Sequence, residues 1–177
     1  MRYLLFWTGL AMLATACSRG DAKSEADPNQ LFATGFENLE GWVIPNPSLT
    51  REKAHSGLYS VKTDPNIEYS LTYNNELGRL SPQRLNKFRL TAWVFNDKAE
   101  PAQLVLQITR SAEDNSNVLY EKIDLSQAVK AGEWTEVSKE ITLPAEAAAN
   151  NPIKIYLWRS GSTLPTYLDD LALTVVP

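Results

Sequence analysis

Apolar and polar residues alternate in steps of two along much of the chain from Leu31 onward. In the segment 102–110 the apolar side chains share one face and the polar side chains the other, and only Val105 departs from this pattern. A period of two is typical of a β-strand with one buried face. Asn, Asp, Gly and Pro, which favour turns, interrupt the alternation at short intervals. The pattern therefore predicts a series of short strands joined by turns.

The predicted strands lie near residues 31–37, 58–63, 67–73, 87–96, 102–110, 118–124, 134–143, 153–159 and 166–175. Only the short alanine-rich stretch 145–149 has a helical character. Strands that do not alternate with helices indicate an all-β protein with antiparallel sheets. We therefore expect one domain over residues 31–177, an antiparallel two-sheet β-sandwich of the jelly-roll, galactose-binding-like type.

The first 16 residues have the layout of a secretory signal peptide. Arg2 precedes an apolar stretch from Tyr3 to Leu13, and the small residues 14–16 follow it. The apolar stretch is too short to span a bilayer, which needs about 20 residues. We expect residues 1–16 to direct the protein out of the cytoplasm.

Cys17, the only cysteine, directly follows this leader. Its setting resembles the lipobox of bacterial lipoproteins, in which the cysteine is acylated and becomes the mature N-terminus, although Leu13 stands one position further from the cysteine than is usual. We expect lipidation of Cys17. Attachment to the outer membrane is expected because Ser18 is not the aspartate that commonly retains such proteins in the inner membrane. The alternative is an ordinary cleaved leader followed by a chance cysteine.

Residues 17–30 form the expected tether between Cys17 and the domain, because no large apolar side chain occurs in 18–30. The whole chain has a formal net charge of −4 and no basic cluster. A nucleic-acid partner is therefore not expected.

Several short motifs resemble, in order, those of the CBM4/9 (CenC-like) jelly-roll carbohydrate-binding modules. They are Phe36-Glu37-Asn38 with Gly41-Trp42, the segments 55–60, 88–94 and 132–137, and the closing run from Tyr167 to Leu173. The resemblance covers the chain from about Leu31 to Val175. It implies a two-sheet sandwich, often with a structural calcium ion near the chain ends, and glycan binding on a sheet face or at the loop tips. A shared fold does not by itself transfer sugar binding.

The resemblance also implies a ligand set for a structural Ca²⁺. Glu37 and Asp169 would supply carboxylates, the turn 53–57 would supply carbonyl groups, and Asp170 is the alternative carboxylate. Ca²⁺ takes about 6 to 8 oxygen ligands, including backbone carbonyls. The alternative is that these carboxylates cap turns or remain solvated.

Strand parity separates a set of aromatic and polar side chains from the predicted core. Aromatic rings stack on the apolar C–H faces of sugars, while polar neighbours bond the hydroxyl groups. The expected carbohydrate-binding residues are Trp158, Tyr156, Trp93, Tyr120, Arg89 and Gln107, with Phe95, Gln103 and Lys154 on the same outward faces. Trp93 has packing beneath a covering loop as its alternative, and Trp42 and Trp134 are expected to be structural. Tyr59, Tyr69 and Tyr73 are expected in the core or at sheet edges. A bulge would reverse the parity.

His55 is the only histidine, and its His-Ser-Gly setting is typical of a turn. A His-centred triad or a histidine metal cluster is therefore not expected, and no catalytic residues are assigned. We expect a lipid-anchored, extracytoplasmic, non-catalytic carbohydrate-binding module. Two alternatives stay open: a structural or protein-interaction subunit of a cell-envelope complex that uses the same sandwich without a sugar site, and a small hydrolase, which would need a cleft with paired carboxylates.

Overall fold

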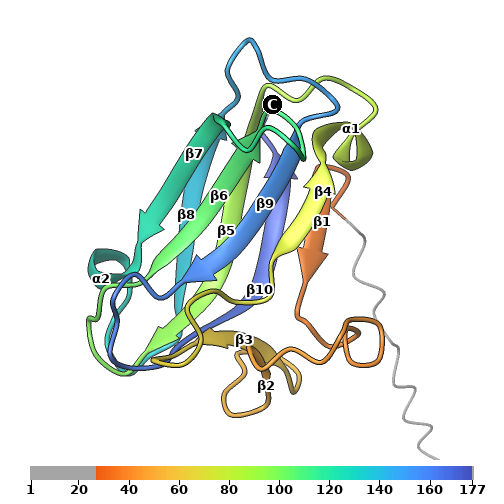
Figure 1. The fold of residues 1–177 in the computed structure, drawn as a ribbon. Helices are drawn as coiled ribbons and strands as arrows, with labels where there is room; N and C mark the ends of the chain where they lie inside the picture. The colour runs from red at the N-terminus through yellow and green to blue at the C-terminus, as the bar shows by residue number, and fades with distance from the viewer. Residues whose placement is uncertain (1–26, 177) are drawn as a thin grey trace, which may run out of the picture.

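A computed structural model describes residues 27–176 and shows two antiparallel β-sheets packed face to face (Figure 1). The six-stranded sheet has the order β2-β3-β10-β5-β8, with β1 also paired to β10, and the four-stranded sheet has the order β4-β9-β6-β7. The strands are β1 (Gln30–Thr34), β2 (Leu49–Thr50), β3 (Ser60–Thr63), β4 (Tyr73–Glu76), β5 (Lys87–Asn96), β6 (Gln103–Thr109), β7 (Asn117–Asp124), β8 (Thr135–Thr142), β9 (Pro152–Trp158) and β10 (Thr166–Val175). This architecture confirms the predicted all-β jelly-roll sandwich.

Two of the predicted elements differ from the structure. The predicted strand 67–73 is wrong for most of its length, since only Tyr73 belongs to β4 and the rest has isolated bridges alone, from Ile67 to Asp64 and from Tyr69 to Trp158. The predicted helix 145–149 is also wrong. That segment forms turns after Pro144, held by a hydrogen bond of 2.7 Å from the Ala148 N–H to the Asn151 side chain.

The structure instead places two short helices next to strands, α1 (Leu77–Leu80) and α2 (Leu125–Ala128). The Asp124 carboxylate accepts a hydrogen bond from the Ser126 N–H and so caps α2. Each helix buries one leucine, Leu77 and Leu125, against the sandwich. Their lengths of four residues fit a closing turn at the end of a strand more than an independent element.

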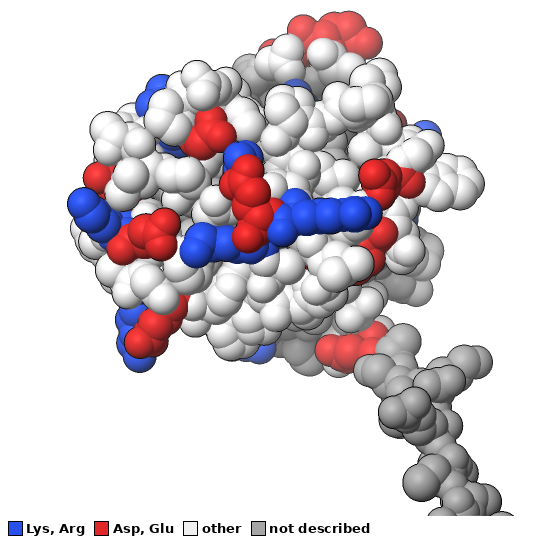
Figure 2. Space-filling model, turned by 90° about the horizontal axis from the view of Figure 1, so that it is seen from below, with Lys and Arg blue, Asp and Glu red and all other residues white. Residues whose placement is uncertain are grey.

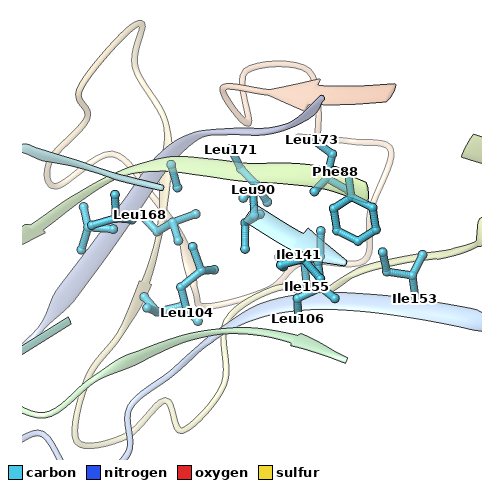
Figure 3. Close-up of a cluster of buried hydrophobic side chains, with 14 of the residues drawn as sticks. Phe88, Leu90, Leu104, Leu106, Ile141, Ile153, Ile155, Leu168, Leu171 and Leu173 are labelled. Carbon is cyan, nitrogen blue, oxygen red and sulfur yellow. The ribbon is translucent and has the colours of Figure 1, made fainter. Parts of the chain in front are cut away.

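The core lies between the inner faces of the two sheets (Figure 3). Alternate residues of β5, β6 and β9 supply a large part of it, as the period of two predicts. Phe88, Leu90, Leu104, Leu106, Ile153 and Ile155 are each at most 1% exposed. Burying one such side chain stabilises the fold by about 1.5–3 kcal/mol.

A bulge in the middle of β10 brings two acidic residues against the loop that precedes β3. The pairing of β10 with β5 shifts register between Asp169 and Ala172, and Asp170 has a positive φ of 46°. Because of this shift, Leu168 and Leu171 both point into the core, although strict alternation would put them on opposite faces. The residues between them, Asp169 and Asp170, meet the loop that precedes β3.

Candidate functional site

The outer face of the four-stranded sheet carries most of the residues that parity selected. Across β6 and β9, Gln103 pairs with Trp158 and Gln107 pairs with Lys154. On the other side of β6, Gln107 pairs with Tyr120 of β7. All five side chains share the face that points away from the core, because the residues between them are core residues or inward-facing ones.

Aromatic rings form a cluster at one end of this face. The Tyr69 ring lies nearly parallel to the Trp158 ring, with centroids 6.2 Å apart, and stands edge-on to the Tyr156 ring at 5.7 Å. Tyr69 is 54% exposed and Tyr120 is 39% exposed. Tyr69 therefore lies at a sheet edge, where it extends the aromatic surface beyond β9.

Glu68 holds the indole of Trp158 in place. The Trp158 Nε1–H donates to Glu68 Oε1 at 2.7 Å, and the Arg159 Nε–H donates to Glu68 Oε2 at 2.8 Å. The hydrogen bonds from Trp158 and Arg159 lower the pKa of the Glu68 carboxyl. Sequence reasoning did not select Glu68, and alternation carries no signal for a residue that follows a turn rather than a strand.

The floor of the face is apolar, with polar groups around it. Val105 points outward yet is fully buried, because Lys122 and Tyr156 flank it in register. Burial raises the pKa of the Tyr156 hydroxyl to about 12, and the nearby Tyr120 adds to the shift. Beside Trp158, the buried Oε1 of Gln103 has no hydrogen-bond partner among the described residues. Val105, which interrupts the alternation, thus lies on the outer side of the sheet, where its neighbours cover it.

Trp93 and Arg89 do not join this face, so the expected set does not form a single site. Both belong to β5 of the six-stranded sheet. Arg89 forms an ion pair of 2.6 Å with Glu140 of β8. Trp93 is stacked on His55, with centroids 3.8 Å apart and an interplanar angle of 10°. Parity shows which side of a strand points outward but not to which sheet the strand belongs.

The loop 51–58 covers the outer face of the six-stranded sheet. Besides His55 on Trp93, the Lys53 ammonium lies 4.2 Å from the centre of the Phe95 ring, and Tyr167 donates to Glu52 at 2.9 Å. Trp134 packs edge-on against His55 at 5.7 Å. The alternative of packing beneath a covering loop therefore describes the position of Trp93.

The carboxylates expected to bind calcium all contact this same loop region. Asp169 is fully buried, and its Oδ2 accepts from the His55 N–H at 2.8 Å and the Ser56 N–H at 3.1 Å. Burial raises the pKa of Asp169, while the backbone hydrogen bonds oppose the shift. Glu37 Oε1 accepts from the N–H groups of Leu58 and Tyr59, each at 2.8 Å. These carboxylates thus cap the loop.

The described side chains alone do not form a metal site around Glu37 and Asp169. Within residues 27–176, no three or more His, Cys, Asp or Glu side chains form a cluster that could hold a metal ion. Glu37 lies in the loop after β1 and not in the strand as expected, and a Cβ at Gly57 would collide with its carboxylate. A cation here would need backbone carbonyls in addition to the carboxylates of Glu37 and Asp169, which is a donor set that Ca²⁺ accepts.

His55, Ser56 and Asp170 lie together but not in the geometry of a catalytic triad. The His55 Nδ1 lies 2.6 Å from Asp170 Oδ2, and Ser56 Oγ donates to Asp170 Oδ1 at 2.7 Å. In a triad the histidine bridges the hydroxyl and the carboxylate. Here both groups bind the carboxylate, so the serine is not activated by the histidine.

The lower end of the molecule carries charges of both signs in contact with one another (Figure 2). Arg51 pairs with Glu40 at 3.0 Å, and Lys62 pairs with Glu52 at 2.6 Å. Two apolar side chains of the loop between β1 and β2, Trp42 and Ile44, are each 88% exposed. The expectation that Trp42 is a structural core residue is therefore wrong, because no described residue buries its side chain.

The expected signal peptide, Cys17 and most of the tether lie outside the described residues. Among residues 27–176, neither helix has the length and apolar character that a membrane crossing requires.

No protein-family model matches the chain. Among curated proteins, endo-1,4-β-xylanase A of Thermoanaerobacterium saccharolyticum is 27% identical over 154 residues, covering 82% of this chain and 12% of the xylanase. Endo-1,4-β-xylanase C of Paenibacillus barcinonensis is 26% identical over 134 residues, covering 68% of this chain. The chain spans 12% of the length of each of these relatives.

Solved structures share the fold at low sequence identity. The CBM22-1 xylan-binding domain of Paenibacillus barcinonensis Xyn10C matches with a TM-score of 0.54 and 15% identity, over 83% of this chain and 94% of that domain. The C-terminal family 22 carbohydrate-binding module of Clostridium thermocellum Xyn10B matches with a TM-score of 0.54 and 12% identity, over 83% and 93%. The chain thus has the jelly-roll fold of carbohydrate-binding modules. These neighbours are family 22 modules rather than the CBM4/9 modules that the sequence resembles.

Proposed function

We propose that the chain is a non-catalytic carbohydrate-binding module that binds a xylan-like polysaccharide on the outer face of its four-stranded sheet. The observation that carries the proposal is the row of Tyr69, Trp158 and Tyr156 on one accessible face, with Tyr120 nearby. Aromatic rings with amide and charged neighbours are the groups that bind sugar rings and their hydroxyls. The xylanase relatives and the xylan-binding structural neighbours support this polymer class.

The remaining sequence expectations complete the proposal. Cys17 would carry a lipid that holds the domain at the bacterial cell envelope, and the outer membrane is the proposed location. The segment 17–30 would then join the lipid anchor to the domain, so that the outer face of the four-stranded sheet could reach glycans near the membrane. A nucleic-acid partner does not fit the net charge of −4.

The experiment that tests the proposal is a screen of the purified chain against soluble and insoluble polysaccharides, with xylans included. We expect saturable binding to at least one xylan, weakened by Tyr120→Ala, because Tyr120 lies on the proposed face and is exposed enough to remove without unfolding the domain. Trp42→Ala is the matched control, since Trp42 is exposed but lies in a loop off that face. Absence of binding to every glycan by the folded protein would refute the proposal, as would equal losses in both variants.

An envelope interaction subunit is the second candidate. The observation that favours it is the pair of exposed apolar side chains Trp42 and Ile44, each 88% accessible. Exposed aromatic and aliphatic side chains are enriched at protein interfaces. Failure of the glycan screen would make this the leading candidate, with partner capture on wild-type and Trp42→Ala protein as the next experiment.

A structural calcium ion at Glu37 and Asp169 is also proposed. Because a ligand that binds only the folded state stabilises it, calcium at about 100 times its dissociation constant should add about 2.7 kcal/mol. We expect the melting temperature to rise by roughly 5–10 °C on adding Ca²⁺ and to fall again with a chelator. Glu37→Gln should lose this response but keep its bonds to the Leu58 and Tyr59 N–H groups, which makes it the matched variant. Melting temperatures unchanged by Ca²⁺ and by chelator would rule the ion out.

A further inference from the structure

Two lysines, Lys122 and Lys154, lie between aromatic residues on the outer face of the four-stranded sheet, the proposed glycan face. Val105 of β6 pairs with Lys122 on one side and Tyr156 on the other, and Gln107 pairs with Tyr120 and Lys154. Across β7, β6 and β9 the residues are therefore Lys122, Val105 and Tyr156 in one register and Tyr120, Gln107 and Lys154 in the other, so the lysine and the tyrosine change sides. Residues two apart on a strand share a face and lie about 7 Å apart, so each lysine is next to a tyrosine on its own strand.

Neither ammonium group is neutralised by a carboxylate within the described residues. Lys154 Nζ has only a long contact of 3.4 Å with the Asn115 side-chain oxygen. The acidic residue beside Lys122 in sequence, Glu121, points to the other side of β7 and pairs with Lys139 at 2.6 Å. Among the described residues, Lys62, Lys87 and Lys139 have carboxylate partners, whereas Lys98 and Lys130, which lie in loops off this face, do not.

The acidic groups on or beside this face lie away from the two lysines and have other partners. Glu68 pairs with Arg159 at 2.5 Å, and Glu76 lies 3.5 Å from Arg79. Asp124 accepts from the Ser126 N–H and hydroxyl at the end of β7. Lys122 and Lys154 are therefore two positive charges in the middle of this face without a carboxylate partner among the described residues, whereas Asp124 lies at its end, although the whole chain is acidic, with a net charge of −4.

We infer that the face selects polysaccharides whose sugars carry carboxylate groups, such as uronic acid substituents, over neutral chains of the same backbone. This inference rests on the proposed glycan-binding function of the face. A sugar stacked on Tyr120 or Tyr156 places its substituents next to Lys122 or Lys154. An ammonium group without a partner gains an ion pair there, whereas a neutral sugar offers it only hydroxyl groups.

The test compares glucuronoxylan with the same polymer after chemical reduction of its carboxyl groups, which removes the charge and keeps the backbone. With the full chain at low ionic strength, we expect the native polymer to bind about tenfold more tightly than the reduced one, and less selectively at high salt. Lys122→Gln and Lys154→Gln should each weaken binding to the native polymer by about two- to fivefold and leave the reduced polymer unaffected. Lys98→Gln, an exposed lysine in the loop after β5, is the matched control.

The outcomes separate the inference from the proposed function. Equal affinity for the two polymers, or losses in the lysine variants that are the same for both, would overturn the inference and leave glycan binding intact. Binding to neither polymer would overturn the proposed function and the inference with it. Binding to polyglutamate as tight as to glucuronoxylan would also overturn the inference, because it would show attraction to any polyanion.

Discussion

Replacing Asp169 by Ala should lower the free energy of unfolding by about 3–5 kcal/mol, because its carboxylate accepts three backbone hydrogen bonds and each donor left without an acceptor costs about 1–3 kcal/mol. Asp169 is fully buried, and its two oxygens accept hydrogen bonds from the N–H groups of His55, Ser56 and Asp170. Without the carboxylate these three partly buried N–H groups lose their acceptor. Urea unfolding followed by tryptophan fluorescence measures the change.

The measurement should be made with a calcium chelator present, so that loss of a bound ion does not add to the loss of hydrogen bonds. Asp97→Ala is the matched control, because the Asp97 carboxylate is 53% exposed and forms only a long contact of 3.9 Å with Lys53. Its expected cost is less than about 1 kcal/mol. If Asp169→Ala costs no more than this control, the loop 51–58 does not depend on the Asp169 carboxylate for its conformation.

Alternation was sufficient to predict the strands that form the core and the direction of their side chains. In β6 and β9, Leu104, Leu106, Ile155 and Leu157 point inward as expected. The physical reason is that successive side chains of a strand point to opposite faces, so a strand buried on one face needs an apolar residue at every second position. The signal therefore lies in the local sequence. β5 and β10 have the bounds that the pattern predicts for the same reason.

Alternation could not show which strands share a sheet. Trp93 and Trp158 both point outward, yet β5 and β9 belong to different sheets, and pairing between distant strands leaves no mark in the local pattern. The covering of Trp93 by His55 depends on the loop 51–58, whose conformation is held by Asp169 and Asp170 from the far end of the chain. A contact of this sequence separation is outside the reach of a local pattern.

The alanine-rich segment 145–149 shows how tertiary context overrides local propensity. Alanine is the best helix former, but a helix this short is marginal by itself. The segment follows Pro144 and is tied to Asn151, which also donates to the Arg110 carbonyl at 2.9 Å. The hydrogen bonds of Asn151, which fix the connection between β8 and β9, therefore determine the conformation of the segment more than its helix propensity does.

Trp158→Ala should weaken glycan binding by about 30-fold or more, the loss typical of a central aromatic residue at a binding surface. The Trp158 indole lies beside Tyr69 and opposite Gln103. Its removal takes away a stacking surface for the sugar and also the ring against which Tyr69 packs. Isothermal titration with the glycan that binds most tightly in the polysaccharide screen measures the change. Affinity within threefold of the wild type would place the sugar elsewhere.

Glu68→Ala tests whether the orientation of the indole matters as well as its presence. Because Glu68 binds the Trp158 Nε1–H at 2.7 Å, its loss should release the ring and weaken binding by roughly three- to tenfold, the range for residues coupled through one contact. In the double variant, Glu68→Ala should add nothing to Trp158→Ala, since its effect passes through that ring. Glu146→Ala, an exposed acidic residue in the connection between β8 and β9, should leave affinity unchanged. Additive losses in the double variant would mean that Glu68 contacts the sugar directly instead of positioning Trp158.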